Sequence, residues 1–341
     1  MRNDLVRKNI ELLKPYTSAR DEFKGTAEVY LDANENPYNT AYNRYPDPLQ
    51  KKLKERIASL KGVKPEQIFL GNGSDEAIDL LIRAYCEPYQ DIILLTEPTY
   101  GMYSVCASVN GVPIMNASLT RGFDLDLPLV LSLINDSTKI IFLCSPNNPS
   151  GNLLDREKIE QIIQKFNGLV VVDEAYIDFA NDSGFAPSLA LYPNLVILQT
   201  LSKAWGLAGL RLGMCLASPE IIQILNKIKY PYNVNTVTQQ LVLEALQHSD
   251  KKDLWVNTIL VEREKLKQAL LKLNGVIMVH PSDANFLLVK MINAKGVYQS
   301  LLQKGIVVRN RSSVIQCDDC LRITIGTPQE NEILINALKN I

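Results

Sequence analysis

The sequence predicts an α/β fold in which helices sandwich a mostly parallel central sheet, followed by a smaller α+β domain. Three observations lead to this prediction. Short continuous apolar runs alternate with segments of helical periodicity, which is typical of strands buried on both faces of a parallel sheet. Polar or glycine-rich turns follow several of these runs directly. The chain has 341 residues, a length that favours two domains.

In the first half of the chain, apolar spacing predicts the elements in order. Residues 49–60 have helical periodicity, and Gly62 follows as a stop signal. A strand at 68–70, a glycine-rich turn and an amphipathic helix at 78–85 come next. Four further compact apolar runs are predicted strands: Ile92–Leu95, Ile140–Cys144, Leu169–Val172 and Leu195–Leu198. A helix over 159–166 lies between the second and the third of these strands.

After residues 211–216 the pattern changes to longer helical segments. These lie at 221–228, 239–246 and 255–273, and they precede apolar runs at 286–289, 306–308 and 321–325 and a last helix at 333–341. We therefore expect three parts. Residues 1–44 form an N-terminal arm or lid that packs on the small domain or over the site, residues 45–235 form the large domain, and residues 236–341 form the small one.

Composition and charge argue against several functional classes. The formal net charge is −1, so no global basic field recruits nucleic acid or an anionic membrane. The first thirty residues lack a signal-peptide core, and no run approaches the ~18 apolar residues of a membrane span. Six cysteines in a chain of this length do not resemble a disulfide framework. We expect a cytoplasmic protein that binds neither nucleic acid nor membrane.

The sequence offers little support for a metal site. Cys317 and Cys320 form a C-x-x-C pair, but no second cysteine pair or paired histidines accompany it. The two histidines, His248 and His280, are far apart in the sequence. We read both cysteines as structural and keep zinc or redox chemistry as a minor alternative.

In open α/β sheets, ligands bind beyond the carboxyl ends of the strands, so polar residues placed there are candidates for a site. Gly71–Asp75 follows one strand and opens a helix, whose N-terminus offers free N–H groups to a phosphate. Ser74 suits the N-cap position. Ser145–Gly151 follows another strand and displays Asn147 and Asn148. By itself, the first segment is better explained as an ordinary capped turn, and the second is equally well explained as a plain turn.

Two further strand ends carry charged residues. Asp173 ends a buried strand, where a carboxylate is costly unless a metal ion or a protonated pyridine nitrogen meets it. Lys203 follows the run at 195–198, and partial desolvation would lower its pKa and make the amine nucleophilic. Arg211, eight positions later, could hold a phosphate. Taken alone, Lys203 would be an ordinary surface lysine.

Taken together, these four segments closely resemble the fold-type-I aminotransferases that depend on pyridoxal 5′-phosphate (PLP), in the branch that contains histidinol-phosphate aminotransferase. Four other motifs extend the resemblance over nearly the whole chain: LDANENP at 31–37, YNRYPD at 42–47, PTYGMY at 98–103 and LRITIGT at 321–327. The combination is highly specific for the superfamily and less specific for the substrate.

The resemblance implies PLP as the cofactor and a role for each matched residue. Lys203 would form the Schiff base with PLP and shuttle a proton, and Asp173 would keep the pyridine nitrogen protonated. Tyr176 and Asn148 would bond the ring oxygen, and Tyr100 would stack on the ring. The remaining matched residues would bind the cofactor phosphate: Gly73, Ser74, Asp75, Ser202, Arg211 and Tyr45. Of these, Tyr45 would come from the second subunit of a homodimer.

On the substrate side, Arg322 matches the family arginine that binds the anionic end. Arg309 matches a second arginine of the histidinol-phosphate branch, although Arg311 could be the partner instead, and surface salt bridges are the plain alternative. Tyr16 and Asn34 resemble the family's N-terminal lid.

The implied reaction interconverts L-histidinol phosphate and 2-oxoglutarate with imidazole acetol phosphate and glutamate, in histidine biosynthesis. A threonine-phosphate decarboxylase of cobalamin synthesis and an aromatic amino-acid aminotransferase are the alternatives. A regulator built on the same fold would need an added DNA-binding segment, for which the chain has no basic helix.

Overall fold

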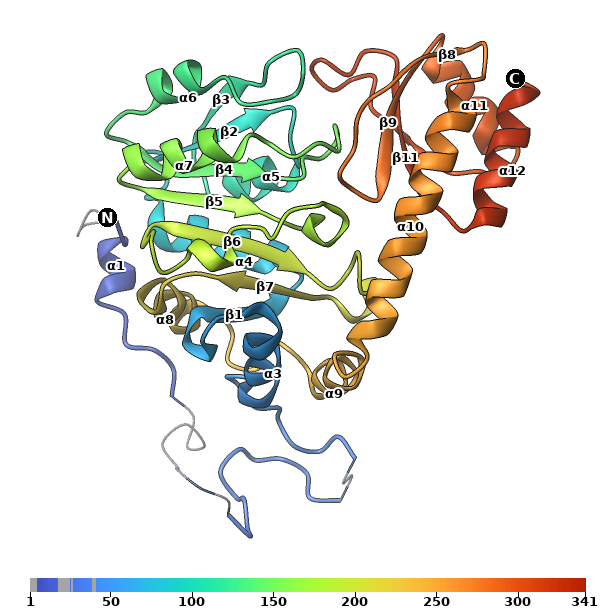
Figure 1. Ribbon diagram of the computed structural model, residues 1–341. Coiled ribbons are helices and arrows are strands. Elements are labelled where there is room, and N and C mark those ends of the chain that lie inside the picture. Colours follow the sequence, from blue (N-terminus) through green and yellow to red (C-terminus); the bar gives the residue numbers. More distant parts are fainter. Residues whose placement is uncertain (1–4, 18–24, 26, 39–40) are drawn as a thin grey trace.

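Two β-sheets, each covered by helices, organise the protein (Figure 1). The computed structural model describes residues 5–17, 25, 27–38 and 41–341. The first sheet belongs to a large domain, and the second belongs to a smaller unit near the C-terminus. The two units are joined by one long helix, α10 (Ser249–Leu270).

The large sheet has seven strands in the order β1-β7-β6-β5-β4-β2-β3. Strands β2 to β6 pair in parallel, whereas β7 is antiparallel to both of its neighbours. The mostly parallel sheet predicted from the sequence is thus confirmed. The strand bounds are β1 (Ile68–Asn72), β2 (Ile92–Glu97), β3 (Ile114–Ser118), β4 (Thr138–Cys144), β5 (Leu169–Asp173), β6 (Leu195–Thr200) and β7 (Leu212–Leu216).

Helices cover both faces of this sheet, because successive strand side chains point to opposite sides. On β4, Ile141 and Leu143 pack on one face, whereas Ile140, Phe142 and Cys144 pack on the other. The first face is covered by α3 (Lys51–Lys61), α6 (Leu127–Leu133), α7 (Arg156–Lys165) and α9 (Thr236–Ala245). The second is covered by α4 (Ser74–Tyr85), α5 (Met102–Val109) and α8 (Pro219–Ile228).

Two helix ends show how local sequence sets these elements. Helix α3 ends at Gly62, whose φ of 66° is the left-handed conformation expected of a glycine stop signal. Helix α4 begins one residue earlier than the sequence suggested. Gly73, with φ of 73°, is its N-cap, and Ser74 is the first helical residue. The expectation that Ser74 caps α4 is therefore wrong, since the glycine makes the turn.

The second sheet is antiparallel and has the order β10-β11-β9-β8. Its strands are β8 (Val276–Val279), β9 (Phe286–Met291), β10 (Arg309–Asn310) and β11 (Cys320–Thr324). Helices α10, α11 (Ala294–Gln303) and α12 (Pro328–Lys339) bury one face of it. The predicted strand at 306–308 is wrong. Residues 306–308 follow a turn at Gly305 and have no strand partner in the described part of the chain, so strand pairing begins only at Arg309.

Packing of α9 bears on where the small domain starts. Val242 of α9 and Leu246 share a core with β4 to β7, whereas Leu266 and Leu270 of α10 share one with β9 and β11. The boundary predicted after residue 235 would divide the first of these cores. We therefore propose that the small domain starts within α10.

The N-terminal segment contacts the large domain. Leu5 is buried with α4 and α8, Arg7 bonds Glu87 at 3.1 Å, and Lys227 Nζ donates to the carbonyl of Glu11 at 2.7 Å. Residues 5–12, which include α1 (Lys8–Glu11), thus lie against α4 and α8, whereas the sequence led us to expect packing on the small domain. Residues 27–38 and 41–46 extend away from the large sheet, beyond α3 and α9 (Figure 1).

Neither a membrane-spanning helix nor a disulfide is found in the part of the chain that the structure describes. Every helix there is too short or too polar to cross a bilayer. All six cysteines are free and buried. Burial raises the pKa of Cys317 to about 12 and that of Cys320 to about 11, and both thiols pack in the core beside Leu288 of β9.

Candidate active site

A cavity lies at the carboxyl ends of β4, β5 and β6 and holds about 550 Å³ of empty space, part of it open to solvent. Its walls include many residues to which the strand-end argument and the family resemblance pointed: Gly73, Ser74, Asp75, Tyr100, Asn148, Asp173, Tyr176, Ser202, Lys203 and Arg211. Cys144, Ala175 and Thr200 also line it and were not anticipated. Cys144 ends a predicted strand and Thr200 comes two residues after another, so the same argument could have included them.

Parallel pairing explains why residues so far apart in the sequence meet here. Cys144, the last residue of β4, pairs with Asp173, the last residue of β5. Asp173 in turn pairs with Leu198 of β6, which lies five residues before Lys203. The carboxyl ends of the three strands therefore form one edge, and the loops that follow them enclose the cavity.

Asp173 is almost fully buried, at 2% exposed, and both of its oxygens accept hydrogen bonds. Tyr103 Oη donates to Oδ2 at 2.6 Å, and the backbone N–H of Ala175 donates to Oδ1 at 3.1 Å. Burial raises the pKa of Asp173 to about 6, although the two hydrogen bonds act in the opposite direction. Tyr103 was missed by the sequence reasoning because no local pattern links it to Asp173.

Lys203 lines the same cavity, but its side chain is open to solvent there. The pKa of Lys203 is nevertheless lowered, first because nearby protein desolvates the amine and then because the Arg322 charge repels it. The Asp173 charge acts in the opposite direction. The Lys203 amine lies 5.7 Å from the centre of the Tyr176 ring. The side chain of Lys203 is thus exposed, and partial desolvation lowers its pKa as the sequence led us to expect.

An anion cradle lies where α4 begins. The backbone N–H of Gly73 donates to the carbonyl of Arg211 at 2.6 Å, which brings the two loops together. A Cβ at Gly73 would lie 2.7 Å from Arg211 Nη2, so glycine is needed for this close approach. Ser202 accepts a 3.0 Å hydrogen bond from Thr200. The first N–H groups of α4, two hydroxyl groups and a guanidinium therefore face one end of the cavity.

The small domain contacts a residue of the cavity wall through β11. Arg322 Nη1 donates to Asn148 Oδ1 at 2.6 Å, and its guanidinium lies 5.2 Å from the centre of the Phe286 ring. Arg309 pairs with Arg322 in the β10–β11 ladder, and Arg311 comes two residues after Arg309, on the same side of the chain.

The three guanidinium groups influence one another. Burial and then the Arg322 and Arg309 charges lower the pKa of Arg311. Arg311 Nε is buried without a hydrogen-bond partner among the described residues. Arg322 and Arg311 of the small domain thus bring positive charge near Tyr176 of the large domain.

The candidate residues Arg309 and Arg322 are not among the residues that line the cavity, and three further candidates do not line it either. Asn34 and Tyr45 line a separate cleft together with the start of α9. The Tyr45 ring stacks on that of Tyr232, with 4.4 Å between the ring centres. Tyr16 is 71% exposed. Within one chain, therefore, none of the three lines the cavity that contains Lys203.

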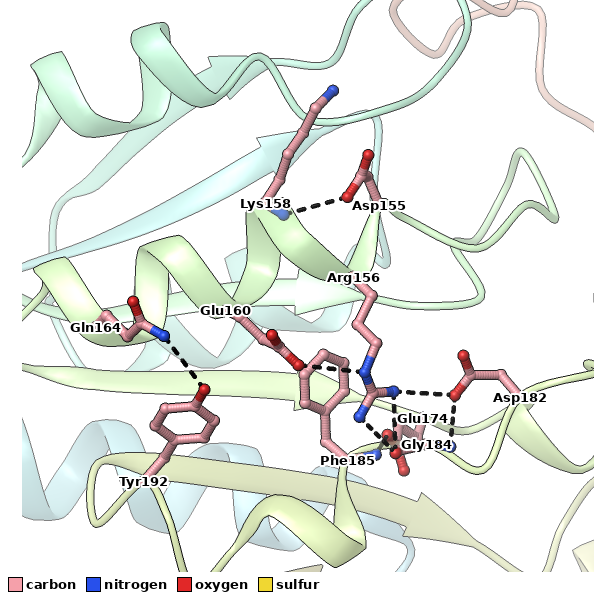
Figure 2. A network of polar contacts seen from close by, with 10 residues as sticks. All are labelled: Asp155, Arg156, Lys158, Glu160, Gln164, Glu174, Asp182, Gly184, Phe185 and Tyr192. Carbon is pink, nitrogen blue, oxygen red and sulfur yellow. Dashed lines mark hydrogen bonds and ion pairs between the residues drawn. The ribbon is translucent and has the colours of Figure 1, made fainter.

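Polar contacts hold the loop at Gly184 and Phe185 in place (Figure 2). Glu174 accepts hydrogen bonds from the backbone N–H of Phe185 at 2.6 Å and from Gln199 at 2.8 Å. Arg156 binds the carbonyl of Gly184 at 3.2 Å and lies over the Phe185 ring at 4.2 Å. Burial raises the pKa of Glu174 to about 7. Glu174 thus holds this loop through Phe185, whereas its neighbour Asp173 lines the cavity.

Comparison with known proteins identifies the family. The family model for aminotransferase class I and II matches residues 19–338. The chain belongs to this family. A curated relative from Parabacteroides distasonis, named histidinol-phosphate aminotransferase, is 60% identical over 338 residues, which cover 99% of this chain and 98% of the relative.

Solved structures show the same fold. A histidinol-phosphate aminotransferase from Clostridium acetobutylicum superposes with a TM-score of 0.81 at 27% identity, covering 87% of this aminotransferase and 90% of that chain. A second one, from Sinorhizobium meliloti in complex with pyridoxal 5′-phosphate, gives 0.80 at 24% identity, with coverage of 87% and 82%. Both likenesses support the fold-type-I architecture predicted from the sequence.

Class I and II aminotransferases depend on PLP, and the cavity of this aminotransferase suits that cofactor. One end offers N–H, hydroxyl and guanidinium donors for a phosphate. A buried acid lies at the end of β5, where a protonated ring nitrogen would satisfy it. Lys203, with its lowered pKa, supplies an amine to the same cavity.

Proposed function

We propose that this aminotransferase moves the amino group of L-histidinol phosphate to 2-oxoglutarate, giving imidazole acetol phosphate and glutamate, as a step of histidine biosynthesis. The name of the Parabacteroides relative supports histidinol phosphate as the amino donor. We further propose a cytoplasmic location, which fits the six buried cysteines that carry no disulfide.

The position of Arg322 is the observation that carries the proposal. Its guanidinium bonds Asn148 at the cavity wall, with Arg309 opposite it in the sheet ladder. Histidinol phosphate presents a phosphate and no α-carboxylate, whereas glutamate presents carboxylates and no phosphate. A planar guanidinium binds either anion through two parallel N–H bonds, so Arg322 can serve both half-reactions.

In this proposal each residue at the cavity has one task. PLP, when bound, supplies an electron sink for the bond that breaks at the amine-bearing carbon of the substrate. Lys203 carries the cofactor and, once released, moves the proton at that carbon. Asp173 holds the proton of the ring nitrogen, and Tyr176 and Asn148 donate hydrogen bonds to the ring oxygen. Tyr100 packs on the ring face.

The phosphate of the cofactor belongs, in the same proposal, at the start of α4. Ser74, Asp75 and the backbone at Gly73 would contact it, with Ser202 and Arg211 on its other side. The charge of Arg211 is only partly used within the protein, because its closest approach to Asp75 is 3.8 Å. A bound phosphate would complete its coordination.

Replacement of Arg322 by alanine should raise the KM of both substrates. Loss of a charge-assisted hydrogen-bond pair predicts an increase of roughly ten- to a hundredfold for each. Steady-state kinetics with histidinol phosphate and with 2-oxoglutarate as the varied substrate measure this. Arg322→Lys is the matched variant, since it keeps the charge but loses the planar fork, and it should be intermediate. A rise in only one KM would refute the shared arginine.

Absorbance spectroscopy and product analysis test the reaction itself. Addition of histidinol phosphate alone should convert the lysine-bound cofactor band to an amine form, and 2-oxoglutarate should restore it. Release of CO2 without a 2-oxo acid would instead identify a decarboxylase. Turnover of phenylalanine equal to that of histidinol phosphate would favour the aromatic aminotransferase.

We also propose that the enzyme is a homodimer with shared sites. Tyr45 is half exposed, at 51%, and lines a cleft separate from the cavity of its own chain, which suits a contact with the cofactor phosphate of a partner. The lid role of Tyr16 and Asn34 belongs to the same proposal, and so does the contact of Arg309 or Arg311 with substrate.

A mixed dimer tests this sharing. Tyr45→Ala and Lys203→Ala should each have little activity alone, because each damages every site. After unfolding and refolding together, a mixed dimer would contain one intact site, so activity should recover to about a quarter of the wild-type value. Refolded samples of each single variant are the controls. No recovery despite sedimentation of a mixed dimer would show that Tyr45 serves its own chain.

A further inference from the structure

A fully buried tyrosine lies directly behind the acid of the cavity. Tyr103 belongs to α5, one turn after the cavity residue Tyr100, and has 0% exposure. Its hydroxyl donates to Asp173 Oδ2 at 2.6 Å. Strand periodicity explains the meeting, because Asp173 has the same orientation on β5 as Val171, which packs on the face covered by α5. Glu174 points the other way.

The Tyr103 ring has little freedom to move. It stacks on Phe142 of β4, with 4.8 Å between the ring centres and 18° between the planes. The Tyr100 ring meets it edge-on at 5.5 Å. Neighbours on two sides therefore fix the direction from which the hydroxyl reaches Asp173.

Asp173 needs such a donor because its surroundings disfavour a negative charge. Burial is the largest influence on its pKa and raises it to about 6, and hydrogen bonds from Tyr103 and Ala175 oppose this rise. The titratable groups facing Asp173 come from all the elements around it: Asp75, Tyr100, Tyr103, Cys144, Tyr176 and Lys203. Of these groups, Tyr103 donates a hydrogen bond to Asp173.

We propose that Tyr103 is a positioning residue for the reaction, whose hydroxyl fixes the Asp173 carboxylate in the orientation and charge state that the cofactor ring nitrogen requires. This role rests on the proposed pairing of Asp173 with that nitrogen. A carboxylate accepts up to about four hydrogen bonds, so the bonds from Tyr103 and Ala175 leave room for the ring N–H.

The chemistry of Tyr103 suits a donor rather than an acid or base. Its pKa is raised well above the ordinary value, first by burial and then by the Asp173 charge. The hydroxyl therefore keeps its proton at neutral pH. The hydrogen bond can only run from tyrosine to carboxylate while Asp173 is ionised.

The test is the equilibrium binding of PLP to the apoenzyme of Tyr103→Phe, measured by fluorescence across pH. Loss of one hydrogen bond to a charged group predicts a Kd about ten- to a hundredfold higher. Without the Tyr103 hydroxyl, less opposes the rise that burial causes in the pKa of Asp173, so Asp173 stays protonated up to a higher pH. The midpoint below which affinity is lost should therefore move upward by about one pH unit.

Two further variants separate this role from a purely structural one. Tyr85→Phe removes a hydroxyl from another buried tyrosine of the same core and should leave both the Kd and the midpoint unchanged. Combining Tyr103→Phe with Asp173→Asn should shrink the effect of the tyrosine change, because the charge that it serves is gone.

Each outcome decides a separate point. If Tyr103→Phe lowers only the melting temperature, or weakens PLP binding equally in the Asp173→Asn background, the inference about Tyr103 is overturned. If Asp173→Asn alone leaves PLP binding unchanged, the proposed place of Asp173 fails instead, and the inference falls with it. A Kd and midpoint that respond to Tyr103→Phe only when Asp173 is present would support the role.

Discussion

Replacement of Lys203 by alanine is expected to abolish the absorbance of the lysine-bound cofactor and to reduce turnover by at least about 10⁴-fold. General acid–base catalysis alone contributes about 10² to 10⁴, and Lys203 would also supply the covalent attachment. The fold should persist, because the side chain of Lys203 is open to the cavity and packs in no core. Absorbance, circular dichroism and single-turnover kinetics measure these three quantities.

Lys54→Met is the matched control for this prediction. Lys54 is a buried lysine, and burial followed by the charge of Lys229 lowers its pKa to about 8. It does not line the cavity, so its replacement should leave cofactor absorbance and turnover intact. Undiminished activity in Lys203→Ala would refute the catalytic assignment of Lys203.

Replacement of Asp173 by asparagine is expected to weaken PLP binding and to lower kcat by at least about 10²-fold, the size of effect seen when one preorganised electrostatic partner is removed. Asparagine keeps the shape of the side chain but carries no charge, so it cannot hold a ring nitrogen protonated. Steady-state kinetics with saturating PLP and a separate PLP titration distinguish the two effects.

Glu174→Gln provides the control for loss of a buried carboxylate. Glu174 follows Asp173 directly and is equally buried, but it bonds Phe185 and Gln199 away from the cavity. Its replacement should therefore change kcat little. A kcat that falls in Glu174→Gln and not in Asp173→Asn would contradict the proposed division of roles between the two acids.

The centre of the cavity could be predicted from the sequence because parallel strands place their carboxyl ends at one edge. Asn148, Asp173 and Lys203 each follow a compact apolar run, and the structure brings all three to one cavity. Strands could also be told from helices by their apolar spacing, because a strand buried on both faces of a sheet requires a continuous apolar run.

Features that depend on distant packing could not be predicted. Tyr103 is separated from Asp173 by 70 residues, and only the docking of α5 on β4 and β5 brings them together. The contacts of Arg7 with Glu87 and of Lys227 with Glu11 likewise join segments far apart in the sequence, so the N-terminal packing was misjudged.

Local patterns also misled where tertiary pairing decides the outcome. The apolar run at 306–308 looks like a strand, but pairing with β11 starts only at Arg309. The degree to which Lys203 is exposed at the cavity likewise depends on the loops that surround it. The order of apolar and polar residues along the chain carries no information about either arrangement.

The most direct test of the central claim, that Lys203 carries the cofactor opposite Asp173, is chemical mapping of the holoenzyme. Borohydride reduction fixes PLP to the amine that holds it, and mass spectrometry after digestion then locates the label. We predict a phosphopyridoxyl group on the peptide that contains Lys203. A label on Lys54, Lys229 or another lysine instead would contradict the account.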